Sequence, residues 1–248
     1  MENTHRLTRK EKRAIHQNKK KENQQEKINF NLKHIEPLTQ NQKKTFNEYN
    51  DKNLVLFGSA GTGKTFISLY LALKEVLNGD RYKKVIIVRS VVPTRDMGFL
   101  PGSQKEKTKV YEGPYYAIFS ELFGRGDSYE YLKSRGLVEF ISTSFIRGIT
   151  LNDSIVIVDE CQNMTFQELD SIITRIGQNC KIIFCGDYRQ SDFRFMDEKV
   201  GVLNFTKIIA KMKSFGFIEF NHDDIVRSHT VKEYIIQKET QHASYTTT

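Results

Sequence analysis

The sequence predicts a doubly wound α/β domain built on a mostly parallel sheet. Short apolar runs rich in β-branched residues alternate with segments whose apolar residues recur at helical spacing, and this alternation is typical of parallel βαβ units with right-handed crossovers. A glycine-rich turn joins the first run directly to a helical pattern. The clearest expected strands are residues 54–57, 85–88, 155–158 and 182–185.

Weaker patterns complete the expected order of elements. A polar helix ahead of the first strand ends near Tyr49, and the helix after the glycine-rich turn stops at Asn78 and Gly79. The region between residues 89 and 135 contains prolines and several glycines, so its pattern is less regular. The other expected helices are 115–123, 166–176, 200–212 and 224–236, and the other expected strands are 137–141 and 217–220.

Charge is distributed unevenly along the 248 residues, which carry a net charge of +8. Residues 1–30 contain nine Lys or Arg against four Glu and few apolar residues, so they bury too little surface to offset the entropy of ordering. We therefore expect a disordered basic arm at 1–30, a folded domain at 31–237 and a polar tail at 238–248. The arm either binds nucleic-acid phosphates or only aids solubility.

Composition also bears on the compartment. No apolar run approaches the length of a membrane span, and the N-terminus has no apolar signal core. The three cysteines are an odd number without zinc-site spacing, which favours reduced thiols in a buried sheet. We expect a soluble, cytoplasmic protein with no membrane partner.

The glycine-rich turn carries the strongest chemical signal. Residues 58–65 read GSAGTGKT and fit the phosphate-loop pattern G-x-x-x-x-G-K-[ST] between a strand and a helix. Backbone amides of such a loop, together with the helix N-terminus, hold a polyphosphate. Lys64 would reach the β and γ phosphates, and the Thr65 hydroxyl would ligate Mg²⁺. The predicted phosphate-binding residues are Gly58, Ser59, Ala60, Gly61, Thr62, Gly63, Lys64 and Thr65.

Polar residues follow two further predicted strands. Asp159 and Glu160 end the run at 155–158; the first acid suits a Mg²⁺ site and the second suits polarisation of an attacking water. Gln190 lies in the CGDYRQ segment after the run at 182–185, where its amide could contact the γ-phosphate or the water. Because parallel strands present their carboxyl ends along one edge, these residues are expected to converge on one ligand.

These motifs together resemble the PhoH-like family of phosphate-starvation-inducible ATPases. The segments GSAGTGKT, VVPTRDMGFLPG, RGITL, IVIVDECQNMT and CGDYRQSD occur in the family's order. Two departures are mild: Asp96 stands where the family usually has Glu before GFLPG, and Cys161 replaces the usual alanine of DEAQN. The family is similar to the first motor domain of superfamily 1 helicases. The resemblance implies a single RecA-like P-loop NTPase domain with a short C-terminal α/β extension, using ATP and Mg²⁺.

The resemblance implies further roles. Gln42 stands where such ATPases place a glutamine that reads adenine, and Arg227, in DDIVR, resembles an arginine that reaches a γ-phosphate. Arg147 and Arg175 are additional arginine candidates near the acidic strand, with surface ion pairs as the alternative. Since no second motor domain fits after Asp192, we expect a ring or other head-to-tail homo-oligomer in which Arg227 acts across the interface.

The expected function is Mg²⁺-dependent ATP hydrolysis coupled to single-stranded RNA or DNA. The helicase-like motif order and the basic arm favour it, although no recognised RNA-binding module is present. Two alternatives are a nucleotide-dependent assembly switch and a small-molecule phosphotransferase; the acidic pair and the GDYRQ segment argue against the latter. The residues ahead of Leu38 are too few and too polar to predict an added nuclease domain.

Overall fold

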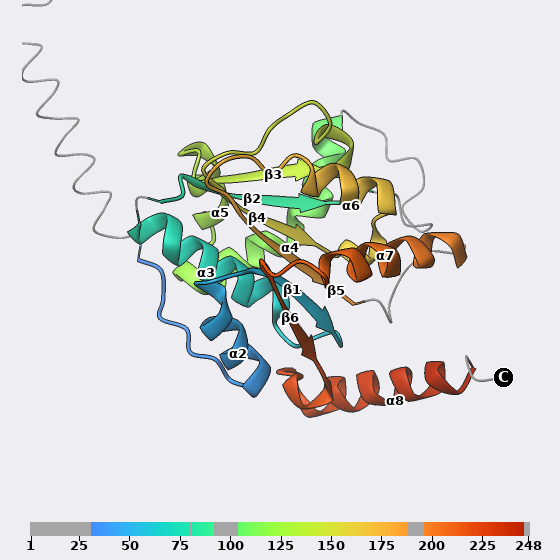
Figure 1. Cartoon of the computed structure of the whole chain (residues 1–248). Helices are drawn as coiled ribbons and strands as arrows, with labels where there is room; N and C mark the ends of the chain where they lie inside the picture. Colours follow the sequence, from blue (N-terminus) through green and yellow to red (C-terminus); the bar gives the residue numbers. More distant parts are fainter. Residues whose placement is uncertain (1–30, 80, 92–103, 188–195, 246–248) are drawn as a thin grey trace, which may run out of the picture.

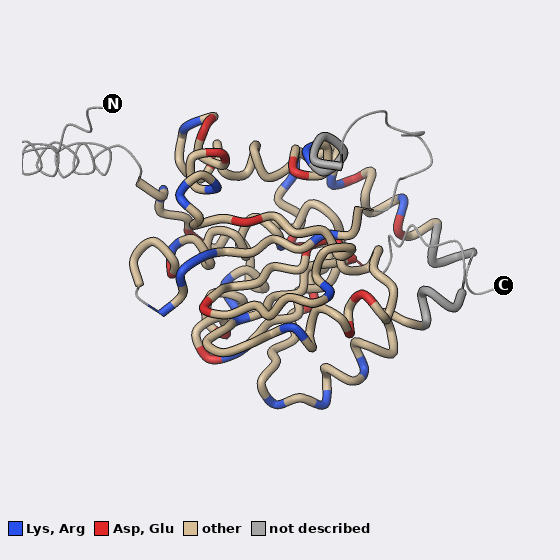
Figure 2. The backbone as a smooth tube through the Cα atoms, turned by 90° about the horizontal axis from the view of Figure 1, so that it is seen from above, with Lys and Arg blue, Asp and Glu red and all other residues tan. Residues whose placement is uncertain are grey.

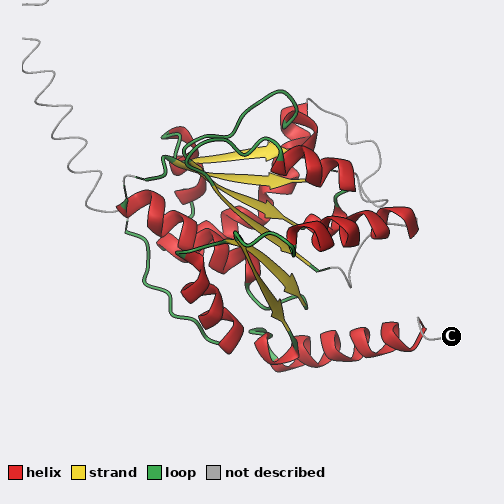
Figure 3. Cartoon of the chain, viewed as in Figure 1, coloured by secondary structure: helices red, strands yellow, loops and turns green. Residues whose placement is uncertain are grey.

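A computed structural model describes residues 31–79, 81–91, 104–187 and 196–245, and in them one six-stranded sheet organises the fold (Figures 1 and 3). The strand order is β3-β2-β4-β5-β1-β6, and each neighbouring pair is parallel. This topology confirms the predicted doubly wound α/β fold. The strands are β1 Asn53–Gly58, β2 Lys84–Arg89, β3 Val138–Ser142, β4 Ser154–Asp159, β5 Lys181–Gly186 and β6 Phe215–Phe220.

Helices cover both faces of this sheet. Alternate strand residues point to opposite sides, so Leu54 and Leu56 pack on α2 to α5, while Val55 and Phe57 pack on α6 and α7. Lys and Arg residues lie mainly around the periphery (Figure 2). The helices are α2 Gln40–Tyr49, α3 Lys64–Asn78, α4 Gln104–Phe123, α5 Ser128–Ser134, α6 Phe166–Ile173, α7 Met196–Ile209 and α8 His229–Tyr245.

The irregular region after β2 is more helical than predicted. Helix α4 begins at Gln104 instead of residue 115, with Pro114 inside it, and α5 was not predicted. Because proline removes one helical hydrogen bond, the sequence predicted that the helix would begin directly after Pro114. Tyr115 and Phe119, both fully buried in the core, anchor the second half of α4.

Helix α6 is shorter than its apolar pattern predicted, ending at Ile173 instead of residue 176. The following backbone bonds to Leu151: the Leu151 amide donates to the carbonyl of Arg175, and the Gly177 amide donates to the carbonyl of Leu151. A parallel bridge between Leu151 and Ile176 therefore replaces the last helical turn. Local periodicity contains no information about this distant partner.

The C-terminal α/β extension consists of β6 and α8, and β6 pairs with β1 along its whole length. Helix α8 starts at His229, five residues after the predicted start, because Asp224 accepts a hydrogen bond from the Asn221 amide and so caps the short 3-10 helix His222–Asp224. It continues to Tyr245, so residues 238–245, predicted as a polar tail, are helical. Helix α7 starts and ends a few residues before its predicted range.

Three further predictions concern the arm, the membrane and the cysteines. The basic arm at 1–30 falls outside the described residues. Within the described ranges, no helix combines the length and apolar character needed to cross a bilayer. Cys161, Cys180 and Cys185 are free thiols, and Cys185 is buried in β5.

Candidate functional site

The carboxyl ends of β1, β5 and β4 are neighbours in the sheet (Figure 1), so the predicted site residues at the ends of β1 and β4 lie at one edge. The loop between β1 and α3 occupies this edge. At its start, Gly58 has φ +131°, and a Cβ there would lie 1.8 Å from the carbonyl oxygen of Phe220. Only glycine permits this close approach of β6. The Ser59 amide also donates to this Phe220 oxygen, at 3.3 Å.

Lys64 folds back over the loop that precedes it. Its Nζ donates to the carbonyl oxygens of Gly58 at 2.7 Å and Ser59 at 2.8 Å. Burial lowers the pKa of Lys64, and the nearby Asp187 acts in the opposite direction. Gly63 is the N-cap of α3 and provides no side-chain cap, so the first-turn amides of this helix face the loop.

Thr65 and Asp159 connect the loop to β4. The Thr65 hydroxyl donates to Asp159 Oδ1 at 2.7 Å, and the hydroxyl of Tyr115, on α4, donates to Asp159 Oδ2 at 2.8 Å. Asp159 is only 4% exposed. Burial and the adjacent Glu160 carboxylate raise its pKa, while the two hydroxyl donors oppose that shift. Both carboxylate oxygens are therefore held in fixed directions.

Glu160 adopts a left-handed backbone conformation, with φ 52°, directly after β4. Gln162 Nε2 donates to Glu160 Oε2 at 2.6 Å, and Gln162 Oε1 accepts from the Asp187 amide at 3.0 Å. A Cβ at Gly186 would lie 2.9 Å from Gln162 Oε1, so a side chain at this position would displace Gln162. Gln162 thus joins the acidic residue after β4 to the end of β5.

Gln42 is buried against the phosphate loop. Its Nε2 donates to the carbonyl oxygen of Thr62 at 3.1 Å, and its Oε1 accepts from the Leu38 amide at 2.7 Å. Both ends of the amide therefore contact backbone, and the side chain supports the loop. The implied contact with adenine stays a prediction.

The segment after β6 packs on the other side of the loop. The Val226 amide donates to the Gly61 carbonyl at 3.0 Å, and Arg227 Cγ would lie 2.8 Å from a Cβ at Gly61. Arg227 is thus beside the loop of its own chain. A role across an interface stays a prediction.

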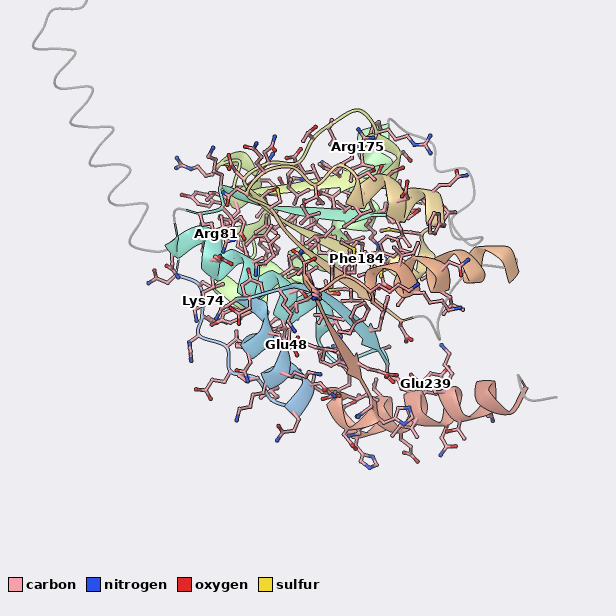
Figure 4. The ribbon with its side chains drawn as sticks, in the orientation of Figure 1. Glu48, Lys74, Arg81, Arg175, Phe184 and Glu239 are labelled. Carbon is pink, nitrogen blue, oxygen red and sulfur yellow. The ribbon has the colours of Figure 1, made fainter. Side chains whose placement is uncertain are left out.

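Helix α8 reaches the same loop through Glu239, which faces the ends of β1 and β6 (Figure 4). Glu239 Oε2 accepts from the Ser59 hydroxyl at 3.0 Å and lies 2.7 Å from His222 Nε2. Three chain segments therefore meet at Ser59.

Of the three other candidates, two lie outside this cluster and one is not described. Gln190 lies outside the described residues. Arg147 is exposed, and the backbone of Arg175 bonds to Leu151, ahead of β4, instead of to the phosphate loop. Sequence reasoning missed Tyr115, Gln162 and Glu239. Gln162 stood in the quoted DECQN segment, while Tyr115 and Glu239 had no local signal that separated them from core or tail residues.

A family model and curated relatives match most of this chain. The family model described as PhoH-like protein matches residues 34–238. The chain is 35% identical over 179 residues to a PhoH-like protein of Bacillus subtilis, covering 72% of this chain and 55% of the relative. It is 32% identical over 173 residues to the protein PhoH of Escherichia coli, covering 69% and 48%. The chain thus spans about half the length of these curated relatives.

Similar solved structures include the large terminase of a thermophilic bacteriophage, with 16% identity, a TM-score of 0.47 and coverage of 80% of this chain and 50% of the terminase chain. A Bacteroides Pif1 bound to single-stranded DNA has 15% identity and a TM-score of 0.37, covering 76% and 42%. The family assignment rests instead on the match over 34–238 and on the curated relatives, which exceed 30% identity over more than two thirds of the chain. This chain belongs to the PhoH-like protein family.

Proposed function

We propose that this domain binds ATP together with Mg²⁺ and hydrolyses the bond between its β and γ phosphates, releasing ADP and phosphate. The observation that carries the proposal is the 2.7 Å contact between the Thr65 hydroxyl and Asp159 Oδ1, next to the loop that holds Lys64. Two residues 94 positions apart meet where a phosphate-loop protein needs its metal ligands. An ordinary glycine-rich turn has no need for a buried carboxylate at this point.

The donor set fits Mg²⁺. A hydroxyl and a carboxylate are hard oxygen ligands, and Mg²⁺ commonly takes only one or two protein groups, with phosphates and water supplying the rest. When bound, Mg²⁺ would neutralise charge on the β and γ phosphates.

Glu160 is the proposed residue that polarises the attacking water. Its hydrogen bond with Gln162, at 2.6 Å, fixes the carboxylate beside Asp159. The strained φ of 52° supports a functional reason for this placement, because such conformations persist mainly where the surrounding structure holds them. Lys64 would neutralise charge on the phosphates from the loop side.

Arg227 is proposed to supply positive charge to the same phosphates. Its place beside Gly61 supports action within one chain, whereas the head-to-tail homo-oligomer requires action between chains. Mixing Lys64→Ala protein with Arg227→Ala protein separates these cases. Recovered hydrolysis in the mixture supports action across an interface. Two inactive variants that stay inactive when mixed support action within one chain.

Coupling to single-stranded RNA or DNA is the finer part of the proposal, and the net charge of +8 with its excess in residues 1–30 supports it. The test is phosphate release from ATP with and without single-stranded RNA or DNA, over a salt series. Polymer-stimulated release supports the coupling. Transfer to a small acceptor would identify a phosphotransferase, and ATP binding without turnover would identify an assembly switch.

A further inference from the structure

The carboxylate of Asp159 has two oxygens, and a different helix supplies a donor to each. Thr65, at the start of α3, donates to Oδ1, and Tyr115, on α4, donates to Oδ2 at 2.8 Å. Thr65 belongs to the phosphate loop, whereas Tyr115 comes from the segment between β2 and β3. No role follows for Tyr115 from the phosphate-loop pattern itself.

Tyr115 is held firmly in place. Its side chain is fully buried, with ring centroids 6.3 Å from Tyr129 and 5.9 Å from Phe140. Arg89, the last residue of β2, is in register with Asp159 across β2 and β4.

We infer that Tyr115 is a positioning residue for the metal site: it holds Asp159 Oδ2 so that Oδ1 stays directed at Thr65 and at the Mg²⁺ position. This inference rests on the proposed function. Outer hydrogen-bond partners of metal ligands fix ligand orientation, and their removal typically weakens metal affinity about 10- to 100-fold. Without the hydroxyl, the carboxylate would rotate more freely and would lose a donor in a buried setting.

A purely structural role is the competing explanation, and the chain provides a matched control. Tyr129 is also fully buried, and its hydroxyl donates to the Glu112 carboxylate at 2.6 Å. Tyr115→Phe and Tyr129→Phe therefore each remove one phenol-to-carboxylate hydrogen bond from the same core. Only the first bond involves a residue of the phosphate-loop edge. Thermal denaturation of both variants measures the stability that each bond contributes.

The experiment measures binding of a fluorescent ADP analogue in EDTA and over a Mg²⁺ titration, well below the lower melting midpoint. Tyr115→Phe is expected to require about tenfold more Mg²⁺ for half-maximal tightening, with unchanged affinity in EDTA. Tyr129→Phe is expected to match the wild type in both conditions. A Tyr115→Phe titration that coincides with that of Tyr129→Phe would overturn the inference. A wild type that shows no Mg²⁺-dependent binding would instead remove the proposed function.

Discussion

Two lysines whose pKa is lowered by burial lie at opposite ends of the sheet, Lys64 at the carboxyl ends of the strands and Lys181 at the amino ends. Their surroundings indicate a binding role for the first and a structural role for the second. Lys64 stands at the start of α3 and donates to loop carbonyls, whereas Lys181, the first residue of β5, donates to the carbonyls of Tyr49 and Lys52. Burial lowers the pKa of both. Tyr49 ends α2, and its aromatic ring lies 4.4 Å from Lys181 Nζ.

The helix dipole explains the difference. A cation at a helix C-terminus is stabilising and satisfies a carbonyl that has no partner within the helix, so Lys181 has a structural role that needs no ligand. A cation at a helix N-terminus is electrostatically unfavourable. Lys64 occupies such a position at the edge that also holds Asp159 and Glu160. The position of Lys64 therefore fits the proposed binding of an anion, whereas that of Lys181 does not require one.

Of the variants that test this comparison, Lys64→Ala has the largest expected effect. We expect ATP hydrolysis to fall by about 100-fold or more, because preorganised positive charge at the phosphates is lost. The melting temperature should change little, because the carbonyl oxygens of Gly58 and Ser59 lose their donor while a cation is removed from a helix N-terminus. Phosphate release and thermal denaturation measure the two quantities. A strongly destabilised variant would contradict the contrast between the two lysines.

Lys181→Met should show the opposite result. It keeps much of the buried volume but leaves two carbonyl oxygens without this donor, so unfolding free energy should fall by about 2 kcal/mol. ATP hydrolysis per folded molecule should be unchanged. Chemical denaturation measures the stability change. A loss of turnover in fully folded Lys181→Met protein would show that the amino-terminal edge also takes part in catalysis.

Gln162→Ala tests whether the link between β4 and β5 serves catalysis. We expect turnover to fall about tenfold with little change in ATP affinity, because Glu160 loses the amide that orients it. Steady-state kinetics and equilibrium binding separate the two quantities. An increase in the dissociation constant at unchanged turnover would assign Gln162 to nucleotide binding instead.

The smallest expected effect is that of Asp224→Asn, on the segment packed against the loop. Burial alone would raise the pKa of Asp224, but hydrogen bonds from Asn41 and Thr39 lower it overall. Its contribution to stability is therefore present above its unfolded-state pKa and is lost as the pH falls through the lower folded-state pKa. The free energy of unfolding of the variant should be lower than that of the wild type by about 1 kcal/mol near neutral pH, as for a lost helix cap, and the difference should be smaller in acid. Equal losses at all pH values would contradict this assignment.

Sequence reasoning predicted the elements whose signal is local. Short apolar runs placed each strand, and the phosphate-loop pattern together with the strand-end acid predicted that Thr65 and Asp159 would meet. What it missed depends on contacts between distant residues. Glu239 contacts the phosphate loop only because α8 packs near Ser59, which is 180 residues away in the sequence. Tyr115 has the sequence surroundings of a core aromatic residue, and its contact with Asp159 depends on the packing of α4 against β4.

The most direct test of the central claim, that the carboxyl edge of the sheet hydrolyses ATP, is single-turnover phosphate release by Glu160→Gln alongside ATP binding. The substitution keeps the size of the side chain and one oxygen that can accept from Gln162, but it removes the charge that polarises water. We predict ATP binding in the presence of Mg²⁺ within about threefold of the wild type and phosphate release slower by about 10²- to 10³-fold. Phosphate release at the wild-type rate would contradict the claim.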